Sequence, residues 1–254
     1  MPIATGLRAV AATRYVTPLR EGGSLPGLFE ADDDGLYVTK FRGAGQGLLA
    51  LVAEVIGGEL ARRLGLAVPE LVTVEVDPRL AAAEPDPEIQ ELIAASAGSN
   101  LGLDFLPGSL PYAPGAWSVP AALAAEIVWL DALVMNVDRT ARNPNLLLWH
   151  DRLWLIDHGA ALYLHHGGTL GEATAGRAFP LIGEHVLLGA ASSILEAHER
   201  ASDRIEPDTF AEIVELVPGD WLDGVVAGRY VEFLTARLRG GAFAAEAERA
   251  RAGA

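Results

Sequence analysis

The most informative stretch of the sequence is NVDRTARNPN, residues 136–145. The chain contains only four Asn residues, and three of them lie in this stretch. Asp138 and Asn143 stand five positions apart in it. An apolar run directly before it predicts a helix over 121–135, so the stretch is expected to be a loop at the end of a buried helix.

A second acidic position follows this loop. The sequence predicts two short strands over 145–156, joined by a tight turn. Asp157-His158-Gly159 comes directly after the second strand. We therefore expect the carboxylates of Asp138 and Asp157 and the carboxamide of Asn143 to converge on one cleft.

These side chains are the types that phosphoryl transfer from ATP requires. Magnesium prefers hard oxygen ligands, which Asp157 and the side-chain oxygen of Asn143 would supply. A free carboxylate at Asp138 could accept the proton of an attacking hydroxyl and orient it for in-line attack. The motif thus predicts a phosphotransferase with ATP and Mg²⁺ as cofactors.

The phosphates of ATP also need a cation, and Lys40 is a candidate for it. Lys40 is the only lysine of the chain, which has 18 Arg. It lies near the end of a predicted strand over 36–41, and Glu54 lies on the predicted helix over 48–64. An ammonium is a compact, flexible point charge, whereas the planar guanidinium of Arg would place its donors elsewhere. We expect Lys40, held by Glu54, to contact the non-reacting phosphates of ATP.

Composition excludes several other classes of protein. The chain has 254 residues, of which 50% are hydrophobic, so it can bury a sizeable core. It has 34 acidic and 19 basic residues and a net charge of −15, which argues against nucleic acid as a direct partner. The absence of Cys removes disulfides, thiol nucleophiles and Cys-rich zinc sites.

Membrane association is not expected either. The longest apolar stretch, residues 119–135, is interrupted by Glu126 and Asp131, too soon for a membrane span of roughly 20 apolar residues. The first residues show no basic region that leads into an apolar run, so no signal peptide is predicted. We expect a cytoplasmic protein.

The two halves of the chain differ in their patterns, which predicts an α+β protein. The first hundred residues read as a small sheet carrying one helix, with strands over 12–16, 36–41 and 71–76. A passage rich in Gly and Pro follows over 101–120. Beyond it the pattern is mostly helical, with further helices near 180–200, 207–217 and 221–239.

Lys40, Glu54, Asp138, Asn143 and Asp157 together resemble the active-site set of the protein-kinase-like superfamily, and more narrowly that of the HipA-like kinases. The joint order of these residues carries the resemblance, because each of them alone is common at a surface, in a helix or in a turn.

Local stretches support the narrower resemblance. Residues 53–69 are similar to the HipA-type helix and its exit, and residues 136–143 are similar to the HipA-type catalytic loop. The same loop with Ile156-Asp157-x-Gly159 is also similar to the phosphoinositide-kinase version. The resemblance spans residues 13–160.

The resemblance implies a two-lobed kinase fold and a kinase activity. Residues 1–102 would form an N-lobe rich in strands, and residues 103–254 a mainly helical C-lobe, with ATP and magnesium in the cleft. The reaction would transfer the γ-phosphoryl group to a hydroxyl, most readily that of a protein Ser or Thr.

The resemblance also implies a role for each motif residue. Lys40 would act on the α- and β-phosphates, and Glu54 would pair with Lys40. Asp138 would be the catalytic base. Asn143 and Asp157 would hold the magnesium ion.

Two further segments receive a role by their order along the chain. Gly22, Gly23 and Ser24 would form a loop that covers the phosphates with backbone N–H donors. The stretch Asp104-Phe105-Leu106 would lie near the hinge between the lobes, where adenine meets the backbone. Ser24, the only hydroxyl in the phosphate loop, is a predicted site of autophosphorylation.

The sequence departs from the resemblance at a few positions. HipA-type loops usually carry His two residues after their Asp, where this chain has Thr140. His158 stands where many kinases carry Phe. A small-molecule kinase and a nucleotide-binding pseudokinase or scaffold therefore stay open as alternatives. The phosphoacceptor and the oligomeric state are not determined by the sequence.

Three histidines lie close together along the chain, at positions 158, 165 and 166. Their spacing matches no closed zinc pattern, and the surrounding glycines favour a loop. We expect these side chains to be solvated.

Overall fold

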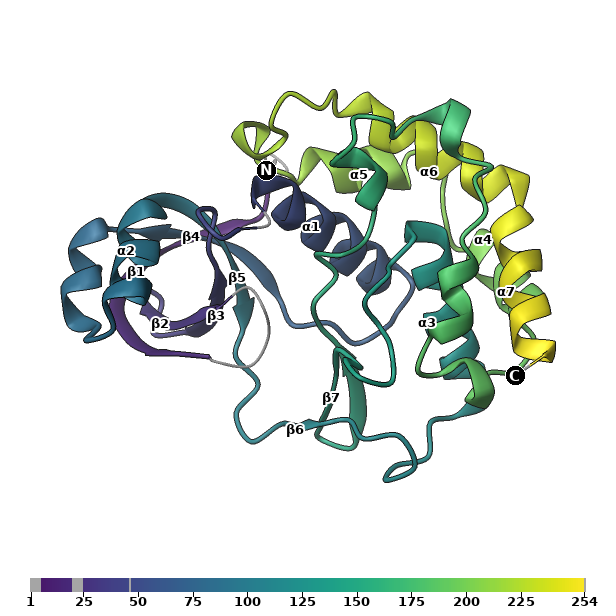
Figure 1. Ribbon diagram of the computed structural model, residues 1–254, viewed down its shortest axis with the longest axis horizontal. Helices are drawn as coiled ribbons and strands as arrows, with labels where there is room; N and C mark the ends of the chain where they lie inside the picture. The colour runs from purple at the N-terminus through teal and green to yellow at the C-terminus, as the bar shows by residue number, and fades with distance from the viewer. Residues whose placement is uncertain (1–5, 20–24, 46, 254) are drawn as a thin grey trace.

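A β-barrel and a larger body of helices lie side by side in the computed structural model, which describes residues 6–19, 25–45 and 47–253 (Figure 1). The barrel is closed, with the strand order β1-β2-β3-β5-β4, because β1 pairs in parallel with β4. Its strands are β1 (Arg8–Pro18), β2 (Gly27–Ala31), β3 (Leu36–Lys40), β4 (Leu71–Val76) and β5 (Gly98–Asp104).

Helix α1 (Gly47–Arg63) follows β3 and lies between the barrel and the other helices (Figure 1). It ends where the sequence predicts, at Gly65, whose φ of +77° suits glycine. The N–H of Leu66 donates to the carbonyl of Ala61 over 3.0 Å, which closes a Schellman motif. The strands predicted over 36–41 and 71–76 are confirmed as β3 and β4.

The prediction of a single helix in the first hundred residues is wrong. Helix α2 (Pro87–Ala95) also lies there, preceded by the 3₁₀ helix η1 (Pro78–Ala83). Asp86 caps the N-terminus of α2, because its side chain accepts from the N–H of Glu88 over 3.1 Å. Its buried side chains, Ile89 and Ile93, join the apolar cluster that fills the barrel.

The sequence did not predict β5, whose residues 101–104 lie in the passage rich in Gly and Pro over 101–120. Gly102 is the reason that the pattern misleads. A Cβ at this position would lie 2.5 Å from a methyl of Val74, so glycine is needed for the close approach of β4 rather than for a turn.

Helix α3 (Ala121–Val134), predicted over 121–135, is apolar on all sides and lies at the centre of the helical body. It contacts α4, α6 and α7, which surround it (Figure 1). The outer helices are α4 (Ile194–Ser202), α5 (Thr209–Glu215), α6 (Gly228–Gly240) and α7 (Ala242–Ala252). The last of these was not predicted, and the segment predicted as helical near 180–200 forms α4 only at its end.

Short 3₁₀ helices fill the connections between these elements. They are η2 (Tyr163–His165), η3 (Glu172–Thr174), η4 (Pro180–Glu184), η5 (Leu188–Ala190) and η6 (Gly219–Trp221). No helix among the described residues combines the length and the apolar character that crossing a membrane requires.

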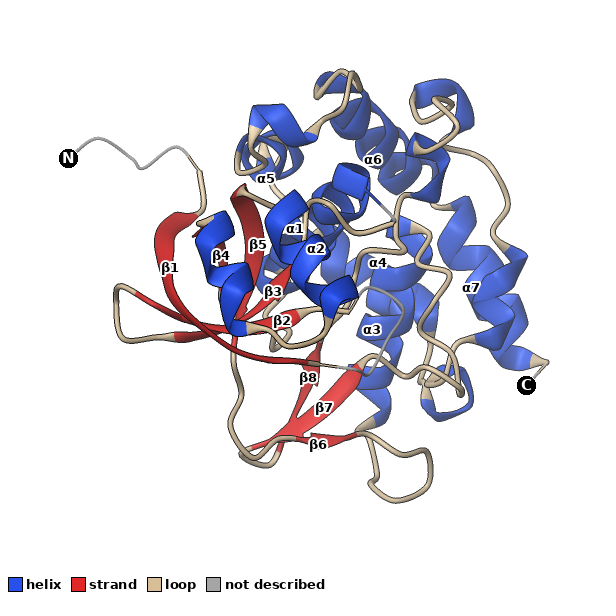
Figure 2. Cartoon of the chain, turned by 60° about the vertical axis from the view of Figure 1, so that its left-hand side comes forward, coloured by secondary structure: helices blue, strands red, loops and turns tan. Residues whose placement is uncertain are grey.

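A three-stranded sheet lies below the barrel, built from β6 (Leu110–Pro111), β7 (Leu146–Trp149) and β8 (Arg152–Leu155) (Figure 2). The strand pair β7–β8 is the hairpin predicted over 145–156. The N–H of Leu155 donates to the carbonyl of Ala67 over 2.8 Å, which ties the hairpin to the segment after α1. Residues 157–159, which follow the hairpin, are thereby brought next to α1, where a Cβ on Gly57 would lie 2.8 Å from the Cβ of His158.

Candidate active site

Lys40 and Glu54 meet because β3 ends at the lysine and α1 turns one buried face toward it. Lys40 Nζ lies 2.7 Å from Glu54 Oε2, and only 12% and 1% of these side chains are exposed. Burial alone would raise the pKa of Glu54, but the Lys40 ammonium, followed by His158, outweighs burial and holds that pKa below its ordinary value. The predicted pair is therefore present, as a buried ion pair.

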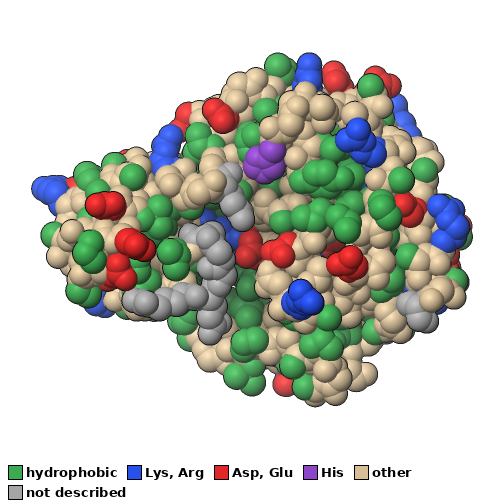
Figure 3. All heavy atoms as spheres, in the orientation of Figure 1, with side chains coloured by type: hydrophobic (Ala, Val, Ile, Leu, Met, Phe, Trp, Pro, Cys, Tyr) green, Lys and Arg blue, Asp and Glu red, His purple; other side chains and the backbone are tan. Residues whose placement is uncertain are grey.

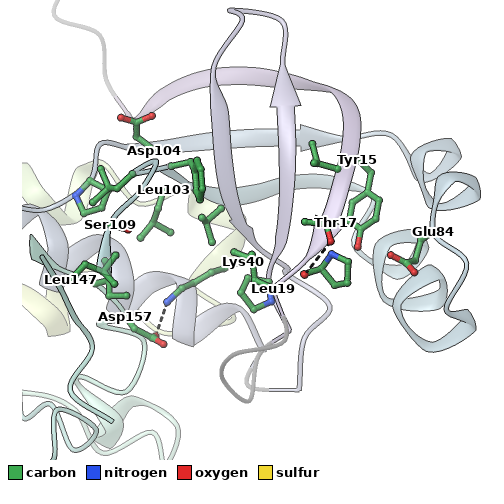
Figure 4. Close-up of a pocket in the computed structure, with 18 of the residues that line it drawn as sticks. Tyr15, Thr17, Leu19, Lys40, Glu84, Leu103, Asp104, Ser109, Leu147 and Asp157 are labelled. Carbon is green, nitrogen blue, oxygen red and sulfur yellow. Dashed lines mark hydrogen bonds and ion pairs between the residues drawn. The ribbon is translucent and has the colours of Figure 1, made fainter. Parts of the chain in front are cut away.

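Asp157 reaches the same ammonium from the other side. Its Oδ1 lies 2.6 Å from Lys40 Nζ, the contact drawn in Figure 4. The residue follows β8 with a φ of +58°, a left-handed conformation that turns its carboxylate toward α1. Burial alone would lower the pKa of Lys40, but Glu54 and Asp157 together hold it above its ordinary value.

A cavity of about 820 Å³ lies beside these residues. Lys40 and Asp157 line it, and Figure 4 shows Lys40 reaching across it toward Asp157. Apolar side chains form much of its wall, among them Val38 and Leu103 of the barrel and Leu147 of β7. Charged side chains gather on the helical side of the hollow between the barrel and the helices (Figure 3).

The predicted hinge segment lines the same cavity through Phe105 and Leu106. The backbone N–H of Phe105 donates to the Leu36 carbonyl over 2.9 Å, so this donor is used within the barrel. Ser109 also faces the cavity a few residues further along. The predicted phosphate loop, Gly22, Gly23 and Ser24, lies outside the described residues.

The loop of residues 136–145, called here the Asp138 loop, is held by its own amides. Asn143 Nδ2 donates to Asp138 Oδ2 over 2.7 Å, and Asn145 Nδ2 lies 3.2 Å from the same oxygen. The N–H of Asp138 donates to Asn136 Oδ1 over 3.1 Å. The structure thus brings the predicted Asp138 and Asn143 together.

Asn145 is a site residue that the sequence reasoning did not single out. Its Nδ2 reaches Asp138 on one side and lies 3.5 Å from the backbone oxygen of Asp157 on the other. It therefore connects the Asp138 loop to the second acidic position. Its φ of +50° is a conformation that Asn adopts more readily than most residues, and this conformation becomes visible only in the structure.

A buried ion pair lies beneath the Asp138 loop. Arg139 Nε donates to Asp131 Oδ2 over 2.6 Å, and both side chains are fully buried. Arg139 Nη1 also donates to the carbonyls of Asn145 and Ile156. Burial would raise the pKa of Asp131, but the charge of Arg139 and a bond from His185 hold it below its ordinary value. Neither partner was predicted as a site residue.

The expectation of solvated histidines is wrong for two of the three. His158 and His165 are each only 1% exposed, and only His166 is exposed. His158 packs against α1 where glycine allows close approach, since a Cβ on Gly57 would lie 2.8 Å from the Cβ of His158. Its Nδ1 lies 3.8 Å from Glu54 Oε1. The ring therefore lies under the Lys40–Glu54 pair rather than in solvent.

The described residues contain no group of three or more His, Cys, Asp or Glu side chains placed to hold a metal ion. The predicted magnesium ligands are a different kind of set, one carboxylate and one amide. Because Asn143 Nδ2 donates to Asp138, its Oδ1 is the atom available to a cation.

The fold of this chain is similar to that of known kinases. The structure is similar to the crystal structure of the Helicobacter pylori proinflammatory kinase CtkA, with a TM-score of 0.57 and 12% identity, covering 97% of this chain and 99% of that one. It is also similar to the Golgi casein kinase with Mn/ADP bound, with a TM-score of 0.54 and 12% identity, covering 97% of this chain and 74% of that one.

A family model for HipA-like kinases matches residues 13–225, and the chain belongs to this family. The resemblance identified from the sequence motifs is thereby confirmed, as is a kinase-like fold that mixes helices and strands. No curated protein matches the chain by sequence.

Proposed function

We propose that this protein is a kinase that uses ATP and magnesium to transfer the γ-phosphoryl group to a hydroxyl, with Ser or Thr of a protein as the favoured acceptor. The observation that carries the proposal is the position of Lys40. Its ammonium lies in the cavity wall, 2.7 Å from Glu54 and 2.6 Å from Asp157. A cation fixed in this way suits the phosphates of a nucleotide.

In this proposal, the barrel forms the N-lobe, which extends to Asp104 because β5 runs past the expected boundary at residue 102, and the residues that follow form the C-lobe. The nucleotide lies between them, because the cavity is lined from both parts of the chain. Its base would pack against apolar walls such as Val38 and Leu103, near Phe105 and Leu106.

At the other end of the cavity, Lys40 would contact the α- and β-phosphates while Glu54 holds it in place. The proposal also assigns backbone donors for the phosphates to Gly22, Gly23 and Ser24, which lie outside the described residues.

Asp157 and Asn143 fit a magnesium ion by the chemistry of their donor atoms. Asp157 uses Oδ1 for Lys40, and among the described residues no hydrogen bond or ion pair involves its Oδ2. Its side chain is 38% exposed, so a cation could reach it. Bound magnesium would neutralise charge on the phosphate oxygens. The structural neighbour with Mn/ADP bound supports the use of a divalent ion and a nucleotide.

Asp138 would accept the proton of the acceptor hydroxyl. Its Oδ2 is bound by the amides of Asn143 and Asn145, which fix the plane of the carboxylate. No hydrogen bond among the described residues involves Oδ1, which leaves this oxygen for the acceptor. The two amides would therefore orient the base without blocking it.

Membership of the HipA-like kinases favours a protein hydroxyl as acceptor over a small molecule. A pseudokinase would have no need for the complete set of Lys40, Glu54, Asp138, Asn143 and Asp157. The departures at Thr140 and His158 are the features that a turnover assay must test.

The experiment compares magnesium-ATP turnover of the wild type with that of Asp138→Asn. Asp151→Asn is the matched control, because Asp151 is exposed in the hairpin turn and, with a φ of +56°, tolerates Asn. Melting with and without magnesium-ATP measures nucleotide binding separately. Mass spectrometry locates the phosphate on the protein, which also tests Ser24.

We expect Asp138→Asn to lower turnover by roughly 100-fold or more, within the range for loss of a general base, and to keep the melting shift caused by magnesium-ATP. Asp151→Asn should behave as the wild type. Turnover that survives in Asp138→Asn would refute the base assignment. A wild type that binds nucleotide and transfers no phosphate would favour the pseudokinase alternative.

A further inference from the structure

His185 lies directly against the Asp138 loop although it is 47 positions away from Asp138 in the sequence. It follows the 3₁₀ helix η4, and it forms an isolated antiparallel bridge with Thr140. The next residue, Val186, donates its N–H to the Arg139 carbonyl over 3.1 Å. The position where the sequence departs from the HipA pattern, Thr140, is thus the one that pairs with this histidine.

Both ring nitrogens of His185 are engaged. Nδ1 accepts from the N–H of Leu187 over 3.1 Å, and Nε2 lies 3.0 Å from Asp131 Oδ2. An Nδ1 that accepts carries no proton, so Nε2 carries the proton and donates it to the carboxylate. Burial lowers the pKa of His185, even against the pull of Asp131, which favours the neutral ring.

Asp131 is shared among three donors. Its Oδ2 accepts from His185 and from Arg139, and its Oδ1 accepts from Asn136 Nδ2 over 3.0 Å. None of the Asp131 side chain is exposed, so water cannot replace a lost donor without a rearrangement. Removing His185 would therefore change the position of the Asp131 carboxylate and, with it, the ion pair with Arg139.

Arg139 passes this constraint to the active site. Its Nη1 donates to the carbonyls of Asn145 and Ile156, the second over 3.3 Å. Asn145 carries the amide that reaches Asp138, and Ile156 directly precedes Asp157. A shift of the guanidinium would thus move both acidic positions together.

We propose that His185 is a positioning residue for phosphoryl transfer, which donates Nε2–H to Asp131 and so holds Arg139, Asn145 and Ile156 in the arrangement that aims Asp138 and Asp157. The inference rests on the proposed function for its effect on turnover. Its effect on the loop geometry can be measured without turnover.

Two substitutions separate the donor from the rest of the ring. Gln places its amide nitrogen at the same number of bonds from Cγ as Nε2, so His185→Gln can still donate to Asp131. The side chain of Asn is one carbon shorter than that of Gln. In His185→Asn its carboxamide oxygen can still accept from the N–H of Leu187, but its nitrogen cannot reach Asp131. His166→Asn is the matched control on an exposed histidine.

The first measurement is steady-state turnover with magnesium-ATP on the full chain. We expect His185→Asn to lower kcat roughly 10- to 100-fold, the effect of a misplaced catalytic group, with KM for ATP within about threefold of the wild type. His185→Gln should recover most of kcat, and His166→Asn should match the wild type. Equal kcat losses for the Gln and Asn variants, or a loss that matches only the fraction unfolded, would overturn the proposal.

The second measurement is hydrogen exchange of the segment around residue 156. The N–H of Ile156 donates to the Asn145 carbonyl over 3.1 Å, the same carbonyl that Arg139 binds. We expect faster exchange there in His185→Asn than in His185→Gln, and unchanged exchange would contradict the proposal. If the wild type transfers no phosphate, the proposed function fails, while this comparison still decides whether His185 holds the loop.

Discussion

The charge and the position of the Lys40 side chain depend on two carboxylates, those of Glu54 and Asp157. The ammonium is almost buried, yet two carboxylates keep its pKa above the ordinary value. An ammonium has three N–H donors, and Glu54 and Asp157 take two of them. The remaining donor is the one that a phosphate in the cavity could use.

Replacing Lys40 by Arg tests this geometry while keeping the charge. The guanidinium fork is planar and longer, so it cannot place one nitrogen within 2.7 Å of both carboxylates and still face the cavity in the same way. We expect Lys40→Arg to lower magnesium-ATP turnover by roughly 100-fold. Arg42→Lys is the control exchange two positions away, and equal activity of both variants would mean that Lys40 is an ordinary lysine.

Left-handed residues mark the ends of the elements that build the site. Met135 follows α3 with a φ of +54°, Asn145 precedes β7 with a φ of +50°, and Asp157 follows β8 with a φ of +58°. Each costs on the order of 1 kcal/mol or more, which the surrounding bonds must offset. The chain turns sharply at these three points, which places the polar side chains of the two loops next to each other.

At the scale of elements, α1 is the helix on which the site depends. It carries Glu54, and one turn further along it presents two adjacent glycines in different surroundings. A Cβ on Gly57 would lie 2.8 Å from the Cβ of His158. A Cβ on Gly58 would lie 3.0 Å from the terminal Cδ1 of Leu71, which can move.

The two glycines predict opposite effects for the same substitution. Alanine favours a helix by about 1 kcal/mol over glycine, so Gly58→Ala should leave the free energy of unfolding unchanged or raise it slightly. Gly57→Ala should lower it by about 1–3 kcal/mol, because α1 must move away from His158. Urea denaturation measures both.

Turnover of the two variants gives a second comparison. Gly57→Ala should also lose activity, because Glu54 moves with α1, whereas Gly58→Ala should keep it. Two variants with the same stability and activity would refute the close packing of α1 on His158.

The elements with a strong local pattern were predictable. α1 and the β7–β8 hairpin follow apolar spacing and turn residues, α3 follows one long apolar run, and Gly65 ends α1 as expected. β5 was missed because Gly102 looks like a turn residue until the neighbouring β4 is in place. α2 was missed because its apolar face is short, and only the open end of the barrel gives it a partner.

At the scale of the whole molecule, two side chains of α6 bind the segment between Gly159 and His185. Arg237 of α6 is buried and donates to the carbonyls of Ala132 and Leu133 at the end of α3, and to those of Ala175 and Arg177. His165 Nδ1 lies 3.1 Å from the hydroxyl of Tyr230, also on α6. Helix α6 thus connects this segment to the base of the Asp138 loop.

The stability of the whole molecule should depend on pH through His165. Burial lowers its pKa from an ordinary value of 6.5 to about 3. Between these two values the unfolded chain binds a proton at His165 that the folded chain does not bind. The free energy of unfolding therefore falls as the pH drops below 6.5, and the loss is complete near pH 3.

Replacing the ring by a group that does not titrate removes this loss. Between pH 6 and 4.5, the free energy of unfolding of His165→Gln should change less with pH than that of the wild type. The difference in slope is expected to be up to about 1.4 kcal/mol per pH unit, the value for one proton. Tyr230→Phe is the control, because it removes the hydrogen bond, about 1 kcal/mol, and keeps the imidazole. Urea denaturation at several pH values measures the slopes, and equal slopes in His165→Gln and the wild type would contradict the prediction.

The sequence by itself determined the family of this protein. A single lysine, the Asp138 loop and Asp157 resemble the active-site set of the HipA-like kinases in type and order, and the family model confirms that family. Only the tertiary structure decided that Asn145 joins the two acidic positions and that His185 reaches Asp131. Asn145 and Asp157 meet across the β7–β8 hairpin, and His185 meets Asp131 across 54 positions with both side chains buried. No local pattern records them, because burial, rather than sequence spacing, selects the partners of buried polar groups.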